Sequence, residues 1–121
     1  MMRDAPKDPS TFLPLKSSTY CVLLALADGE LHGYAIMQAI TEMTSGRQAI
    51  LPGTLYAALA RMVDEELIEE REGVEETSGG PRRRYYRRTK LGKSVARAES
   101  QRLHALLDIA KAQKIFESGR R

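Results

Sequence analysis

The hydrophobic period of the chain changes at Leu67, and this change constrains the fold more than any other feature of the sequence. Before Leu67, apolar residues recur at spacings of three and four, which indicates amphipathic helices. After it, residues 67–74 and 82–88 have the pattern of two strands joined by a loop rich in turn formers. A helical period returns from Lys90 to about Phe116. The expected order is therefore three helices, a two-stranded hairpin and one long helix.

Turn residues bound the three early helices. The first ends at Asp28-Gly29-Glu30, where Gly29 can take the left-handed conformation that closes a helix. The second follows His32-Gly33, and the third starts at Pro52, because proline is tolerated in the first turn of a helix. The third helix should face the core with Leu55, Leu59, Met62 and Val63, and it should expose Thr54, Ala57, Ala58, Arg61 and Glu65.

Charge is distributed unevenly along the chain. Residues 64–76 hold eight acids and one base, whereas the remaining residues carry 18 bases and 8 acids. Five of these bases are arginines within residues 82–88, beside Gly79-Gly80. Gathered bases are typical of proteins that bind a polyanion, because neutralising phosphates releases condensed counterions. The alternative is a solvated ribbon in which these arginines pair with the acids of 64–76 across the hairpin.

The element order is that of a winged helix, mainly α with a two-stranded β wing. Its third helix is narrow enough to enter the major groove of DNA, and its hairpin can reach the flanking phosphates or the minor groove. The candidate DNA contacts are Tyr34, Thr54, Tyr56, Ala57, Ala58, Arg61, Arg82, Arg83 and Arg84. Tyr34 and Tyr56 could equally be packing residues, and His32 is expected to cap the second helix.

Three segments follow from this order. Residues 1–13 are broken by prolines and lack a period, so we expect a flexible N-terminal arm. Residues 14–88 should form the winged helix-turn-helix domain. Residues 89–121 should form a C-terminal dimerisation helix and tail, with Thr89 as the cap. That helix carries more apolar residues than one small domain can cover, which predicts a second copy of the chain as its partner.

Several classes of protein are excluded by composition. The longest apolar run, Tyr20 to Ala27, is too short to span a membrane, and the N-terminus lacks the apolar stretch of a signal peptide. The single cysteine, Cys21, cannot form an internal disulfide, so we expect a cytoplasmic protein. Neither histidine has a second ligand at metal spacing, and no set of catalytic groups stands out. The chain is thus expected to be no enzyme and to hold no metal or cofactor.

Several linked motifs occur along the chain: His32-Gly33-Tyr34, Pro52-Gly53-Thr54-Leu55-Tyr56-Ala57-Ala58-Leu59, Leu67-Ile68, Gly79-Gly80, and Arg82–Arg84 leading to Tyr86-Arg87-Arg88-Thr89-Lys90-Leu91-Gly92. Together these motifs resemble the PadR family of transcriptional regulators. They cover about Leu15 to Gly92 in order. Glu66 departs from the pattern, which usually has glycine there. A left-handed glutamate costs roughly 1 kcal/mol, so we expect this turn to differ.

The resemblance implies a homodimeric, often repressing, DNA-binding protein of the branch with a short, single C-terminal helix. The expected dimer contacts are Val95, Ala98, Leu103, Leu106, Leu107 and Ala110. Two-fold symmetry then predicts a pseudo-palindromic operator. Some relatives bind aromatic or drug-like effectors between subunits. This chain has no tryptophan, so a site for a small hydrophobic effector must use other residues or be absent.

Two other functions stay open at this point. Winged helices also dock partner proteins, and the acidic and basic hairpin could serve as a protein-interaction module. Alternatively, the chain could be a small-molecule sensor in which DNA binding is vestigial.

Overall fold

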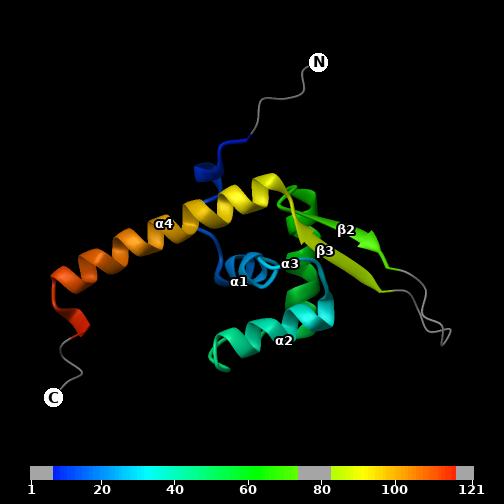
Figure 1. Cartoon of the computed structure of the whole chain (residues 1–121), viewed down its shortest axis with the longest axis horizontal. Helices are drawn as coiled ribbons and strands as arrows, with labels where there is room; N and C mark the ends of the chain where they lie inside the picture. The colour runs from blue at the N-terminus through cyan, green and yellow to red at the C-terminus, as the bar shows by residue number, and fades with distance from the viewer. Residues whose placement is uncertain (1–6, 74–82, 117–121) are drawn as a thin grey trace.

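A computed structural model describes residues 7–73 and 83–116 of the chain (Figure 1). The elements follow the predicted winged-helix order, with one additional short strand and a 3-10 turn at the start. They are η1 (Pro9–Phe12), α1 (Ser17–Ala25), β1 (Leu31–His32), α2 (Gly33–Met43), α3 (Pro52–Asp64), β2 (Ile68–Glu72), β3 (Arg84–Arg88) and α4 (Lys90–Ala112). The predicted fold class, a mainly helical winged helix with a long last helix, is therefore confirmed.

The sheet has three antiparallel strands in the order β1-β3-β2. β3 pairs with β2 so that Glu70 lies opposite Tyr86, and it pairs on its other edge with β1, where His32 lies opposite Tyr85. The prediction of a two-stranded wing is thus incomplete. β1 is only two residues long, too short to show any alternation of apolar and polar residues. This strand fixes the start of α2 to the wing.

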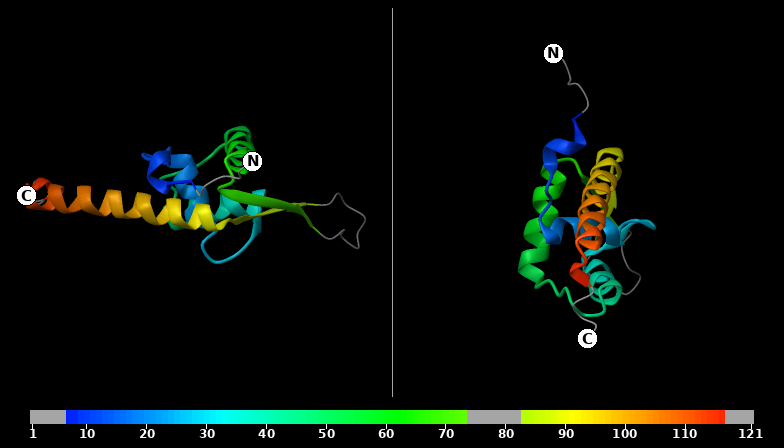
Figure 2. Two further views of the ribbon diagram at one scale, coloured as in Figure 1. Left: turned by 90° about the horizontal axis from the view of Figure 1, so that it is seen from above. Right: turned by 90° about the vertical axis from the view of Figure 1, so that its left-hand side faces the viewer.

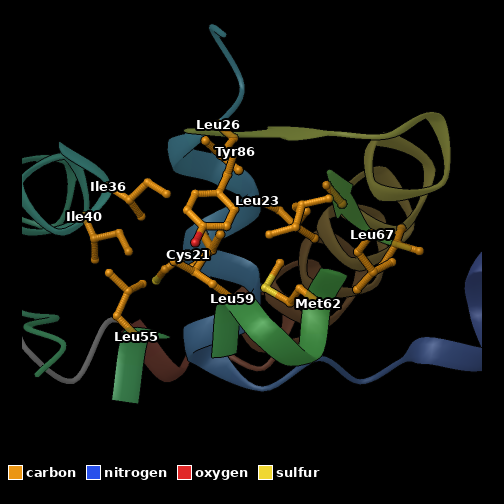
Figure 3. Close-up of a cluster of buried hydrophobic side chains, with 14 residues drawn as sticks. Cys21, Leu23, Leu26, Ile36, Ile40, Leu55, Leu59, Met62, Leu67 and Tyr86 are labelled. Carbon is orange, nitrogen blue, oxygen red and sulfur yellow. The ribbon is translucent and has the colours of Figure 1, made fainter. Parts of the chain in front are cut away.

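The core lies between the three short helices, the sheet and the first turns of α4 (Figure 3). Its fully buried side chains come from all of these parts of the fold: Val22, Leu23, Ile36, Ile40, Leu55, Leu59, Met62, Leu67, Ile68 and Val95. The ring of Tyr86 reaches into the same cluster from β3. The apolar stripes predicted for the three helices therefore meet at one centre.

The turn between α3 and β2 keeps the left-handed form in spite of its glutamate. Glu66 has a φ of 66°. The Leu67 N–H donates to the Met62 carbonyl at 2.9 Å, and the Glu66 N–H donates to the Val63 carbonyl at 3.0 Å. These two bonds satisfy the last carbonyls of the helix, and the buried Leu67 and Met62 lie at the paired apolar positions of this turn. The expectation of a different turn is wrong.

α4 packs on its own domain for its first three turns and then extends beyond it. The Thr89 hydroxyl accepts from the Gly92 N–H at 2.9 Å and so caps the helix. Val95 is completely buried in the core of its own subunit, so the prediction of Val95 as a dimer contact is wrong. Figures 1 and 2 show the C-terminal half of α4 extending on the side of the domain opposite to the hairpin.

The segment before α1 is packed against the domain. Phe12 and Leu13 lie partly buried against the core, and the Leu15 N–H donates to a Glu99 carboxylate oxygen on α4 at 3.4 Å. Asp8 caps η1, because its side chain accepts from the Ser10 N–H. The expected flexible arm is therefore wrong for residues 7–13, since their apolar side chains have a surface to cover. Residues 1–6 of that arm lie outside the described residues.

Candidate nucleic-acid interface

α3 turns its small residues away from the core. The exposed residues along it include Gly53, Thr54, Tyr56, Ala57 and Ala60. Tyr56 is 48% exposed, although its ring rests on the start of α2. A helix face built of Gly, Thr and Ala can approach another surface closely because no long side chain intervenes. This face is what a major groove would meet.

Two residues of the predicted strip lie elsewhere. Ala58 is 2% exposed, so its assignment to the exposed strip is wrong. At about 100° per residue, position 58 falls only about 60° from Leu55 and joins the core stripe. Arg61 is half-buried, and its Nη2 donates to Thr19 Oγ1 on α1 at 3.0 Å. The same helical arithmetic identifies Ala60, one turn after Tyr56, as an exposed residue that the prediction missed.

A surface hollow of about 580 Å³ joins α3 to the wing. It lies between the start of α2, the middle of α3 and the sheet, and it is lined by His32, Gly33, Tyr34, Tyr56, Ala60, Glu70, Arg83, Arg84 and Tyr86. Two predicted contacts from the helices, Tyr34 and Tyr56, thus share one surface with two wing arginines. Tyr34 is 59% exposed there. Arg82, also predicted as a contact, lies outside the described residues.

Ion pairs cross the hairpin, as the alternative interpretation of the charge pattern anticipated. Arg84 Nη1 lies 2.7 Å from Glu70 Oε2, and Arg87 Nε lies 2.9 Å from Glu69 Oε1. The arginine side chains in these pairs are 63% and 65% exposed. Exposed pairs contribute no more than about 1 kcal/mol, so a phosphate can replace the carboxylate. Pairing and DNA binding are therefore compatible at Arg84, which lines the hollow, whereas Arg87 lies outside it.

Arg71 belongs to the opposite face of the sheet. Its guanidinium forms a two-pronged salt bridge with Glu30 and lies 5.2 Å from the centre of the Tyr85 ring. Hydrogen bonds from Arg71 hold the pKa of Glu30 below its usual value. Arg71 therefore links β2 to the loop after α1.

His32 occupies the junction of β1, α2 and the wing. Its Nδ1 accepts from the Ala35 N–H at 3.2 Å, which confirms the predicted helix cap. Its Nε2 lies 2.8 Å from Arg83 Nη1, and its ring meets the Tyr85 ring edge-on at 5.5 Å between centroids. Burial, and then the charge of Arg83, lower the pKa of His32.

The C-terminal half of α4 presents an apolar surface. Leu106 is 50% exposed, Leu103 37% and Leu107 39%, while Ala98 and Ala110 are half-buried. Leu103, Leu107 and Ala110 recur at spacings of four and three, so they share one face. Of the expected dimer contacts, all but Val95 therefore keep surface available to a partner.

Across 7–73 and 83–116, no three His, Cys, Asp or Glu side chains gather as ligands for a metal ion. In those same segments, no helix is long and apolar enough to cross a membrane.

Comparison with known proteins identifies a regulator family. The model of the transcriptional regulator PadR-like family matches residues 22–98. The chain spans 13% and 65% of the lengths of two curated relatives that it matches. The second match is 37% identical over 73 residues, 60% of this chain, with "uncharacterized protein X" of Lysinibacillus sphaericus.

Solved structures with this fold include one that is bound to DNA. A PadR family transcription regulator from Clostridium difficile is 28% identical, with a TM-score of 0.69, over 80% of this chain and 97% of that one. Bacillus subtilis PadR in complex with operator DNA is 25% identical, with a TM-score of 0.62, over 69% of this chain and 47% of that one.

Proposed function

The chain belongs to the PadR-like family of DNA-binding transcriptional regulators, and we propose that it acts as a homodimeric repressor on a pseudo-palindromic operator. The function is regulatory and not enzymatic, in keeping with the family. The protein would act on chromosomal DNA in the cytoplasm and block transcription by occupying the operator.

One observation carries the proposal. Tyr56 and Ala60 of the exposed face of α3 border the same hollow as the wing arginines Arg83 and Arg84, so that face and the wing can meet one duplex. In this arrangement Thr54, Tyr56 and Ala57 enter the major groove. Arg83 and Arg84, together with Arg82, which precedes them in the sequence, are proposed to meet backbone phosphates or the minor groove. Tyr34 adds a hydroxyl at the rim of the same surface.

The dimer is proposed to form through α4. Burial of its exposed leucines is favourable, and a second copy offers the same apolar stripe under two-fold symmetry. Two winged-helix domains related in this way would recognise half-sites about one helical turn apart, ~34 Å. Binding to operator DNA is described for Bacillus subtilis PadR, which has the same fold. A small hydrophobic ligand between the two α4 helices would be the effector that releases DNA.

The test is the salt dependence of DNA binding. Protein captured on fragments of its source genome identifies the operator, and affinity for that duplex is then measured at several salt concentrations. Replacing Arg82, Arg83 and Arg84 with Ala should weaken binding to every duplex. It should also lower the slope of log K against log salt by about 0.9 for each phosphate that the variant no longer neutralises.

A variant that removes a positive charge away from the hairpin provides the control. Lys111→Ala removes one positive charge from the last turn of α4, far from the hairpin, and should leave the slope unchanged. An unaltered slope in the triple arginine variant would overturn the role of the wing. Absence of salt-dependent binding in the wild type would favour the protein-interaction module. Tight ligand binding with no effect on DNA affinity would favour the sensor.

A further inference from the structure

Arg83 is held differently from the ion-paired arginines of the sheet. Arg84 and Arg87 each meet a carboxylate, but Arg83 meets the neutral ring of His32 at 2.8 Å. Within 7–73 and 83–116, no carboxylate forms a salt bridge with Arg83. A neutral partner fixes the direction of a guanidinium without cancelling its charge. Arg83 therefore keeps its full attraction for phosphate.

Two N–H donors point at the two ring nitrogens of His32. The Ala35 N–H points at Nδ1, and an Arg83 N–H points at Nε2. A neutral imidazole has one nitrogen that accepts and one that carries hydrogen, and arginine has no acceptor. The ring can therefore cap α2 or hold Arg83, but it cannot satisfy both donors together. The two donors compete for one lone pair.

A phosphate at the wing would end this competition. When Arg83 turns from His32 to a phosphate oxygen, it exchanges a neutral acceptor for a charged one, and such bonds are about twice as strong. Nε2 can then carry the hydrogen, and Nδ1 is left to cap α2 through Ala35. The exposed position of Arg83, directly before β3, allows this movement.

We propose that His32 is a positioning residue of the DNA-binding surface, which holds Arg83 beside the start of α2 in the free protein and releases it to phosphate in the complex. This inference rests on the proposed function and states how Arg83 is brought to a DNA phosphate. β1 makes it possible, because its pairing with β3 sets His32 opposite Tyr85, two residues from Arg83.

Proton uptake on binding follows from the groups around the ring. Arg83 faces Nε2 from the start of β3, the Ala35 N–H faces Nδ1 from α2, and Tyr85 meets the ring edge. The other charged or titratable groups of the hollow are Tyr34, Tyr56, Glu70, Arg84 and Tyr86, with Glu70 and Arg84 paired to each other. Departure of Arg83 removes a positive neighbour, and phosphate brings a negative one. Protonation gives up the one hydrogen bond that the ring accepts, from Arg83 or Ala35 in the free protein and from Ala35 in the complex, so the change in charge decides the sign. Both changes of charge favour the imidazolium, and DNA should bind more tightly as pH falls from about 8 to about 6.

The first experiment needs no DNA. The ¹⁵N resonances of the histidine rings are recorded by NMR across this pH range in the full chain and in Arg83→Ala. Loss of Arg83 should shift the His32 ring nitrogens and raise the pKa of His32, while His104 on α4 stays unchanged. Identical His32 resonances and titration in the two proteins would overturn the proposal.

The second experiment compares DNA affinity at the two ends of the same pH range. Asn at position 32 offers an oxygen that can still cap α2 but has no ring nitrogen for Arg83. His32→Asn and Arg83→Ala should each lose most of the several-fold gain at the acid end. That gain cannot exceed about tenfold per subunit for each unit of pKa change. His104→Asn, which removes the other histidine, should retain it.

The outcomes separate this inference from the function itself. If the wild type binds its operator and His32→Asn shows the same pH dependence of DNA affinity as the wild type, the inference is wrong and the proposed DNA-binding function is unaffected. If the wild type binds no DNA, the proposed function fails. The ring resonances then still decide whether His32 holds Arg83.

Discussion

The carbonyl oxygen of Leu67 occupies the space that a β-carbon on Gly92 would fill. This oxygen cannot move away easily, because it also accepts the Thr89 N–H at 3.1 Å and lies 3.1 Å from the Thr89 hydroxyl. The start of α4 is thereby fixed against the turn that leads into β2. Gly92 is needed here for close approach of two backbones, not for an unusual dihedral angle.

Gly92→Ala should therefore destabilise the fold more than an ordinary helix substitution. Overpacking of this kind costs about 1–3 kcal/mol, and the rigid backbone partner places it at the upper end. Urea denaturation measures the change. Gly53→Ala is the matched control, because nothing lies within 4 Å of the added carbon. Equal stability of the two variants would contradict the close approach.

Adjacent alanines on α3 should respond oppositely to enlargement. Ala57→Gln adds an exposed side chain on the proposed reading face, so it should change affinity for the operator with little effect on folding. Ala58→Gln forces a polar group into a site that is 2% exposed, and it should lower the free energy of unfolding by about 2 kcal/mol or more. Thermal melts and operator binding, measured on both, distinguish the two positions.

Glu99 should make stability depend on pH in the acid range. It is 2% exposed, and hydrogen bonds from Arg102 at 2.7 and 2.8 Å hold the pKa of its carboxyl below the ordinary value. A carboxyl whose pKa is lowered by folding contributes stability above the unfolded pKa of about 4. That contribution is lost as pH falls through the folded pKa.

The test compares unfolding free energies at neutral and at acid pH. Glu99→Gln should lose stability at neutral pH and show a flatter decline below about pH 5. In Arg102→Gln, burial of the unpaired carboxyl would instead raise its pKa, so the decline should shrink or reverse. A wild-type acid profile retained by both variants would contradict the buried pair.

Leucines on the free half of α4 should control assembly. Replacing Leu106 and Leu107 with Asp should give a folded monomer that loses specific DNA binding, because both side chains are exposed within one subunit. Sedimentation at micromolar concentration measures the state. Met43→Asp, a charge added to an exposed methionine at the end of α2, should remain dimeric. Dimers of the double Leu variant would refute the interface.

Long periodic segments allowed most of the fold to be predicted from the sequence. Helices α2, α3 and α4 start close to where their glycine, proline and threonine signals indicate. The errors have local causes. β1 is too short to carry a period, and the burial of Ala58 follows from its angle on the helix and not from its residue type.

Pairings between distant segments could not be predicted in this way. His32 and Arg83 are 51 positions apart, and only the strand register brings them together. Val95 belongs to the core because Thr89 and Gly92 set where α4 first touches the domain. A hydrophobic stripe on a helix does not indicate by itself where its own domain ends and a partner begins.

α4 is one uninterrupted helix from Lys90 to Ala112, seated on the domain at one end and free at the other. A rigid rod of this kind transmits rotation as well as distance. If two copies meet through α4, one extra residue inserted after Gln101 would lengthen the helix by about 1.5 Å. It would also turn each winged-helix domain by about 100° relative to the dimer interface. The two domains would then face different sides of the duplex, although the interface residues from Leu103 onward remained in place.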